Sequence, residues 1–141
     1  MSQVHRHFLL SGVQRFALVI LAGLLLLASG CSPPEPVRIG FVGGISGRGA
    51  DLGISGRDGA QLAVEQRNQA GGVAGRPVEI IFRDDHQDPE IARRVVEELV
   101  ELGVSAIVGP MTSAMGVAVV PIVNERKVVM VSPTVTTEDL T

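Results

Sequence analysis

Two groups of polar residues have the types and spacing to do chemistry. The first is Asp84, Asp85, His86 and Asp88, in which carboxylates of the kind that hard metal ions prefer lie close together. The alternative is a solvated loop in which Asp88 caps a helix, because an aspartate directly before Pro89 suits a helix start. We favour the loop and expect no metal site here.

Ser113 is the second candidate, because it stands at the predicted start of a helix that runs to residue 124. Unpaired N–H groups and the helix dipole favour an anion at such an end, and a serine hydroxyl can join them. The alternative is that Ser113 or Thr112 is simply a helix cap and Thr136 an ordinary turn residue. The residue pattern leaves both interpretations open.

The elements that must position these residues alternate regularly along the chain. Short apolar runs bounded by glycine predict strands, and apolar residues at helical spacing predict helices between them. The strands are expected at 37–42, 78–82, 105–108 and 128–131, and the helices at 55–70, 88–102 and 113–124. This order predicts an α/β fold of right-handed units, with an open parallel sheet and helices on both faces.

In such sheets, ligands bind outside the carboxyl ends of the strands. The loops expected at that edge are 43–54, 84–88, 109–113 and 132–137, and two of them are rich in hydroxyl groups. Ser113 and Thr136 both fall in these loops, so we expect them to face one crevice.

The first 30 residues have the layout of a secretory signal, with a basic start, an apolar centre and small residues before Cys31. The apolar run 16–28 is shorter than a membrane span requires. Cleavage before Cys31 fits a lipoprotein signal, although Ala28 replaces the usual leucine, and it also fits an ordinary signal. We expect a lipid-anchored cysteine and tether at 31–36, with a free thiol as the alternative.

Composition excludes several kinds of protein. Without the signal, 111 residues remain, which suits one domain, and their formal charge is near −5 once Arg6 and Arg15 are removed. Lys127 is the only lysine, so we expect no nucleic-acid partner. The stretch 47–53 approaches a G-x-G-x-x-G motif but misses it, and we expect no cofactor.

Several short motifs of the segment 37–141 occur in a characteristic order and spacing. They include RIGFV at 38–42, DGA at 58–60, NQAGGVAG at 68–75 and IVG at 107–109. Together they resemble the first lobe of the periplasmic leucine/isoleucine/valine-binding protein family. The resemblance implies a two-lobed receptor, not an enzyme, that captures an amino acid of branched-chain type or a related small solute. Such a receptor works at the periplasmic face of the membrane and delivers the solute to an ABC transporter permease.

The resemblance also implies roles for individual residues. The position of Ser113 gives its hydroxyl and backbone N–H to the ligand carboxylate, and those of Thr134 and Thr136 serve the ammonium or carboxylate group. Thr112 is assigned to the same site. Leu52 stands where many members carry an aromatic residue over the ligand side chain, which leaves the side-chain preference open.

This chain departs from the family in two further ways. Gln87 and Thr112 occupy the positions of a disulfide in well-known members, so that bridge is absent. The family has a second lobe, so we expect residues 37–141 to be the N-terminal part of the fold and to bind an amino acid more weakly than a full receptor.

Two other functions stay open at this stage. One is the ligand-sensing ectodomain of a membrane signalling receptor, for which a downstream transmembrane helix and signalling domain would be diagnostic. The other is a small exported hydrolase that uses Ser113 and His86.

Overall fold

The computed structural model describes residue 20 and residues 34–140. The predicted signal peptide, apart from Ile20, and Cys31 lie outside the described residues, so their cleavage and lipidation stay predictions. The folded unit begins at Pro34. Within the part of the chain that the structure describes, no helix is both long and apolar enough to cross a membrane.

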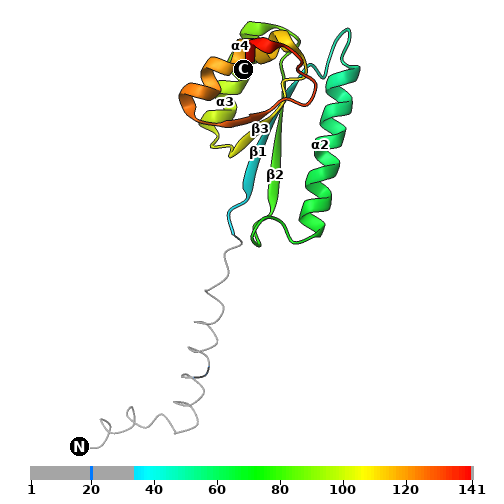
Figure 1. Ribbon diagram of the computed structural model, residues 1–141. Helices are drawn as coiled ribbons and strands as arrows, with labels where there is room; N and C mark the ends of the chain where they lie inside the picture. The colour runs from blue at the N-terminus through cyan, green and yellow to red at the C-terminus, as the bar shows by residue number, and fades with distance from the viewer. Residues whose placement is uncertain (1–19, 21–33, 141) are drawn as a thin grey trace, which may run out of the picture. The chain divides into compact units, whose positions relative to one another are not determined.

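Four parallel strands form a single sheet in the order β2-β1-β3-β4 (Figure 1). The prediction of an open parallel sheet is therefore confirmed, and each strand lies within one or two residues of its predicted position. The strands are β1 (Val37–Gly43), β2 (Val78–Asp84), β3 (Ala106–Val108) and β4 (Val129–Val131).

The helices α2 (Asp51–Gln69), α3 (Pro89–Glu101) and α4 (Ser113–Arg126) connect successive strands, and a short 3-10 helix, η1 (Glu138–Leu140), ends the described chain. We predicted that this first helix would begin at Ser55. That boundary is wrong: Gly53 lies in the first turn, where a Cβ would overlap the carbonyl of Gly44. Close backbone packing outweighs helix propensity there.

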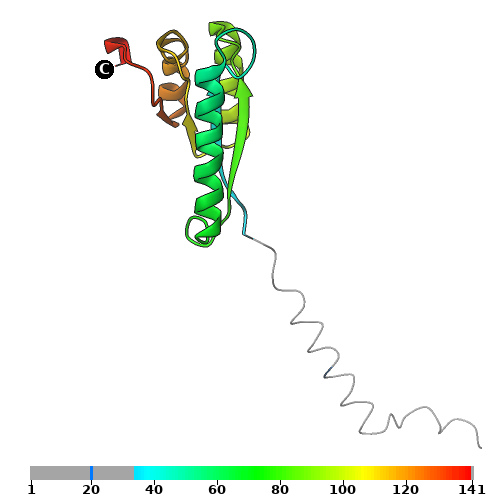
Figure 2. The same ribbon diagram turned by 90° about the vertical axis from the view of Figure 1, so that its right-hand side faces the viewer.

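The helices lie on both faces of the sheet, as predicted. Successive residues of β1 point to opposite faces. A Cβ on Gly40 would lie 2.8 Å from Leu99 of α3, whereas the ring of Phe41 lies near Gly56 of α2. Figures 1 and 2 show α2 on one side of the sheet and α3 with α4 on the other.

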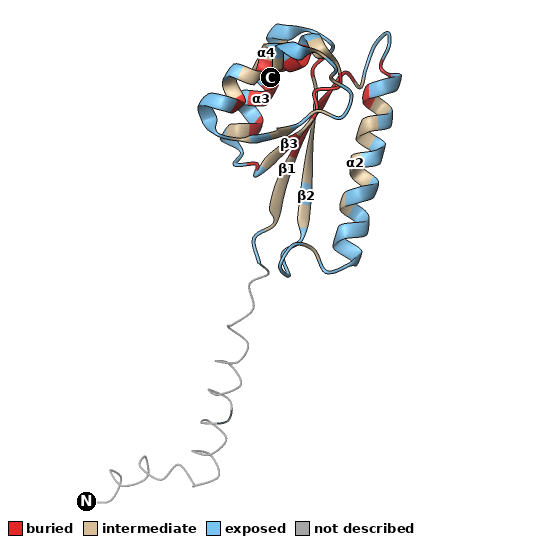
Figure 3. Cartoon of the chain, viewed as in Figure 1, coloured by how far each residue is buried: buried red, intermediate tan, exposed pale blue. Residues whose placement is uncertain are grey.

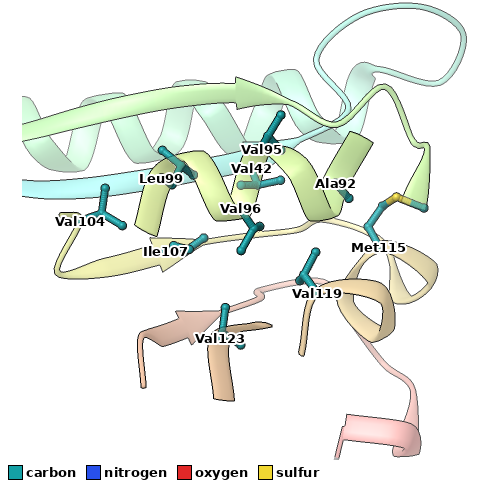
Figure 4. Close-up of a cluster of buried hydrophobic side chains, with 10 residues drawn as sticks. All are labelled: Val42, Ala92, Val95, Val96, Leu99, Val104, Ile107, Met115, Val119 and Val123. Carbon is teal, nitrogen blue, oxygen red and sulfur yellow. The ribbon is translucent and has the colours of Figure 1, made fainter. Parts of the chain in front are cut away.

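The main core fills the space between the sheet and the pair α3 and α4 (Figure 4). Ala92, Val95, Val96 and Leu99 are buried along one face of α3, at the spacing of an amphipathic helix. They meet side chains of the sheet such as Ile107, which is fully buried. In contrast, Gly53 is the one buried residue of α2, and the rest of that helix is exposed or half-buried (Figure 3).

Gly40 and Leu99 test how tightly α3 packs on the sheet. Gly40→Ala should destabilise the fold by about 1–3 kcal/mol, because its methyl group meets a fully buried leucine. Leu99→Ala should cost about 2–5 kcal/mol through the cavity that it leaves.

The double variant distinguishes overpacking from a general effect on the strand. In the Leu99→Ala background the added methyl group has room, so Gly40→Ala should cost much less there. Urea unfolding of the four chains measures this coupling, and costs that simply add would contradict the packing described here.

Candidate functional site

The direction in which successive strands are added to the sheet reverses between β1 and β3, although all four strands are parallel. The chain runs outward from β1 to β2, crosses back past β1 to β3, and then runs outward again to β4. In open parallel sheets the crevice at this switch point, outside the carboxyl ends of the strands, is where ligands bind. The segments that border it are 44–50, after β1, and 109–112, after β3.

The loops after β3 and β4 are joined by hydrogen bonds at every second residue. The Ser132 hydroxyl donates to the Gly109 carbonyl at 2.8 Å, and the Thr134 hydroxyl donates to the Met111 carbonyl at 2.6 Å. In the third contact the backbone N–H of Thr136 donates to the Ser113 hydroxyl at 3.4 Å. Two loops that are 23 residues apart thus form one surface.

This surface brings together four of the five predicted site residues: Thr112, Ser113, Thr134 and Thr136. Leu52 lies on the other side of the switch point, in the first turn of α2, and its side chain is 45% exposed. The predicted site therefore divides into a polar wall from β3 and β4 and an apolar residue from α2.

Met111 links the two sides underneath. It follows β3, it is 3% exposed, and its side chain lies where a Cβ on Gly43 or Gly56 would meet it, at 3.1 and 2.7 Å. At Gly109 the backbone that follows β3 lies directly against β1, because a Cβ on Gly109 would overlap the Val42 carbonyl. The chain beneath the switch point is therefore closely packed.

The N-terminus of α4 has no side-chain cap. Thr112 is its N-cap residue, with extended backbone angles, but its side chain makes no capping hydrogen bond. Ser113 is the first helical residue, and its hydroxyl accepts the N–H of Thr136. Thr112 thus occupies the N-cap position, as one alternative expected, but its side chain gives the first N–H groups of α4 no acceptor.

The contrast with α3 shows that this is a local feature. Asp88 caps α3, and its carboxylate accepts the N–H groups of Glu90 and Ile91 at 2.8 and 3.0 Å, as predicted. Ala50, the N-cap residue of α2, has no side-chain acceptor. The helices α2 and α4, which begin at the switch point, thus lack a side-chain cap. The helix α3, which begins beside the outer strand β2, is capped by the carboxylate of Asp88.

The loops after β1 and β2 are joined in a second set of contacts. The N–H of Ile45 donates to Asp84 Oδ1 at 3.1 Å, and the Ser46 hydroxyl lies 2.9 Å from His86 Nδ1. The side-chain amide of Gln87 donates to the Arg48 carbonyl at 3.1 Å. The sequence predicts these loops at one edge and marks Gln87 only as the position of an absent disulfide, so the contacts of Ser46 and Gln87 were not predicted.

We expect a solvated loop at the acidic run 84–88, and this expectation is wrong for Asp85. Asp85 is 1% exposed; its Oδ1 accepts the N–H of Gln87 at 2.8 Å, and its Oδ2 has no hydrogen-bond partner. Within residues 34–140, no group of three or more His, Cys, Asp or Glu side chains is arranged to hold a metal ion.

The two adjacent carboxyl groups have opposite pKa shifts. Burial raises the pKa of Asp85, and the nearby charge of Asp84 adds to this, against the hydrogen bond from Gln87. Burial also raises the pKa of Asp84, but hydrogen bonds from Ser46 and from the backbone of His86 and Ile45 outweigh it, so the net pKa lies below the ordinary value.

The geometry gives no support to the hydrolase that we considered. His86 uses Nδ1 both for the Ser46 hydroxyl and for Asp84 Oδ2, which lies 3.4 Å away. A serine–histidine–aspartate relay needs the two partners on different ring nitrogens. The contacts of His86 are with Ser46 and Asp84, whereas the Ser113 hydroxyl contacts Thr136.

A hollow of about 410 Å³ lies at the outer edge of the sheet, beside β4. It is bordered by α4, β4 and the segment that leads to η1, and most of its lining residues are of apolar type. It touches none of the five predicted site residues. Its lining consists of Val120, Val123, Asn124, Val128, Met130, Ser132, Val135, Thr137 and Leu140.

The chain is similar to proteins of one kind. The family model described as periplasmic binding protein matches residues 36–141. The Leu/Ile/Val/Thr/Ala-binding protein of Pseudomonas aeruginosa is 34% identical over 134 residues, which cover 92% of this chain and 35% of that protein. The Leu/Ile/Val-binding protein BraC3 of Rhizobium johnstonii is 34% identical over 74% of this chain and 29% of its own length.

Solved structures agree with these matches. The branched-chain amino acid transporter substrate binding protein LivJ of Streptococcus pneumoniae, in complex with isoleucine, aligns with a TM-score of 0.73 and 36% identity. The alignment covers 75% of this chain and 31% of that one. The leucine binding protein LivK of Thermotoga maritima aligns with a TM-score of 0.65 and 28% identity, over 72% and 28% of the two chains. The chain spans about a third of the length of these relatives.

The pH dependence of stability tests the environment of Asp85. Because the folded state binds this proton more tightly than the unfolded state, the contribution of Asp85 is fully present below the ordinary pKa of 3.8 and is lost as the pH rises through the raised pKa. Asp85→Asn removes the titration, so its stability relative to wild type should increase over that range and then level off.

Urea unfolding at a series of pH values measures this difference. The lowered pKa of Asp84 acts in the opposite direction, with stability lost as the pH falls, but both proteins retain it and it cancels to first order. A difference between wild type and Asp85→Asn that stays constant with pH would contradict the raised pKa of this buried carboxyl group.

Proposed function

Since this chain belongs to the periplasmic binding protein family, we propose that residues 34–140 form the first lobe of a receptor that captures a small solute for an ABC transporter. The observation that carries this proposal is the wall of the switch-point crevice. There the Ser113 hydroxyl, the N–H of Thr136 and the uncapped start of α4 come together.

This wall suits a carboxylate. An uncapped helix N-terminus presents N–H groups and the positive end of the helix dipole. The Ser113 hydroxyl can donate to an anion while it accepts from Thr136, and the contact with Thr136, at 3.4 Å, is long enough for a closer acceptor to replace it. The hydroxyl of Thr134 already donates to Met111, so toward a ligand it offers only lone pairs, which suit an ammonium group.

The residue on the other side of the switch point, Leu52, indicates the kind of side chain that the solute carries. Leu52 is apolar and partly exposed in the first turn of α2, and it suits an aliphatic side chain. The solute that fits both sides is a branched-chain amino acid. The relative from Streptococcus pneumoniae, whose structure contains isoleucine, supports isoleucine as the first ligand to test.

The site of action follows from the start of the sequence. We infer that residues 1–30 direct export and that Cys31 is acylated, which leaves the lobe tethered to the periplasmic face of a membrane. The permease of an ABC transporter is then the partner that accepts the solute.

Titration of the ¹⁵N-labelled chain with isoleucine, followed by NMR, tests the proposal. We expect amide shifts in the first turn of α4 and at Thr136, with a dissociation constant in the millimolar range or above. Ser113→Ala should weaken binding about ten-fold, because a hydrogen bond to a charged group is lost. Ser105→Ala, the same change at an exposed position at the other end of β3, should not.

Isoleucinamide provides the matched ligand control. It keeps the aliphatic side chain and the ammonium group but has no carboxylate charge, so it should bind more weakly than isoleucine. Equal binding of the two ligands, or isoleucine shifts that cluster away from α4 and Thr136, would rule out the proposed carboxylate site.

A further inference from the structure

The side chain of Gln87 reaches from the loop after β2 to the backbone of the loop after β1. Its Nε2 donates to the Arg48 carbonyl at 3.1 Å. Its own backbone N–H donates to Oδ1 of Asp85, which is buried. The backbone of Gln87 is therefore held by Asp85, and its side-chain amide is hydrogen-bonded to the main chain of the loop after β1.

The stem of Gln87 also lies against the turn that leads to α2. A Cβ on Gly44 would lie 2.7 Å from Gln87 Cγ, so the side chain rests directly on that backbone. On Gly53, in the first turn of α2, a Cβ would overlap the Gly44 carbonyl. Gln87, Gly44 and Gly53 thus form a stack with no free space between its layers, and α2 begins on top of it.

The backbone at Gln87 has a conformation that is unfavourable for a residue with a Cβ. His86 and Gln87 have φ angles of +49° and +57°, in the left-handed region that side chains with a Cβ disfavour. Such conformations persist where the surrounding contacts demand them, and they gather at functional sites. Here the demand comes from the hydrogen bonds to Asp85 and Arg48 at the two ends of the same residue.

We propose that Gln87 is a positioning residue of the solute site. Its amide sets the position of the loop after β1 and, through Gly44 and Gly53, that of the first turn of α2 with Leu52. This places the apolar side of the crevice relative to the Ser113 wall. The effect on the solute rests on the proposed function, whereas the effect on the loop does not.

Two variants of the full chain remove the amide donor. Gln87→Met keeps the length of the side chain, and Gln87→Glu keeps its shape but turns a carboxylate toward the Arg48 carbonyl. Gln66→Met and Gln66→Glu make the same changes at an exposed position on α2. The readout is hydrogen exchange of the Ile45 amide, which donates to Asp84 across the same pair of loops.

We expect Ile45 to exchange about ten-fold faster in both Gln87 variants than in their Gln66 controls, which is the loss of one hydrogen bond. In Gln87→Glu the ratio should fall toward one as the pH drops below about 4.3, because a protonated glutamate can again donate. Exchange of Ile45 that is unchanged in both Gln87 variants overturns the proposal.

Isoleucine titration separates this proposal from the proposed function. Gln87→Met should bind isoleucine more weakly than Gln66→Met, with shifts at the same residues. Faster exchange with unchanged affinity overturns the positioning role. A wild-type chain that shows no isoleucine shifts overturns the proposed function, and exchange at Ile45 then decides alone whether Gln87 holds the loop.

Discussion

The position of β1 at the centre of the sheet is the constraint on which the rest of this structure depends. It pairs with β2 on one side and β3 on the other, and Gly40, Phe41 and Val42 are buried between helices on both faces. A shift of its register by one residue would turn Phe41 toward Leu99, which leaves no room for a Cβ on Gly40. The loops after β1, β2 and β3 are therefore fixed relative to one another, and the switch point follows from the strand order.

Around that centre, the loops are held in two pairs. Hydroxyl groups join the loop after β4 to the loop after β3, and side chains of the acidic run join the loop after β2 to the loop after β1. The switch point lies between the two pairs, and Met111 packs against Gly43 and Gly56 there. This arrangement keeps the polar wall in place without occupying it, because α4 begins there without a side-chain cap.

Much of this could be predicted from the sequence, for physical reasons. Apolar runs and helix signals gave the four strands and three helices, and the rule for parallel sheets placed Ser113 and Thr136 at one edge, where they touch. The start of α2 was wrong because the close contact of Gly53 with Gly44 is not local in sequence. The burial of Asp85 and the left-handed backbone of Gln87 were missed for the same reason, since both depend on the loop after β1.

The central claim is that the start of α4 receives the carboxylate of an amino acid. A crystal structure of this chain grown with isoleucine tests it most directly. The account predicts electron density for the ligand in the switch-point crevice, with its carboxylate within hydrogen-bond distance of the Ser113 hydroxyl and the first N–H groups of α4. Isoleucine bound in the hollow beside β4, or with its carboxylate turned away from α4, would contradict it.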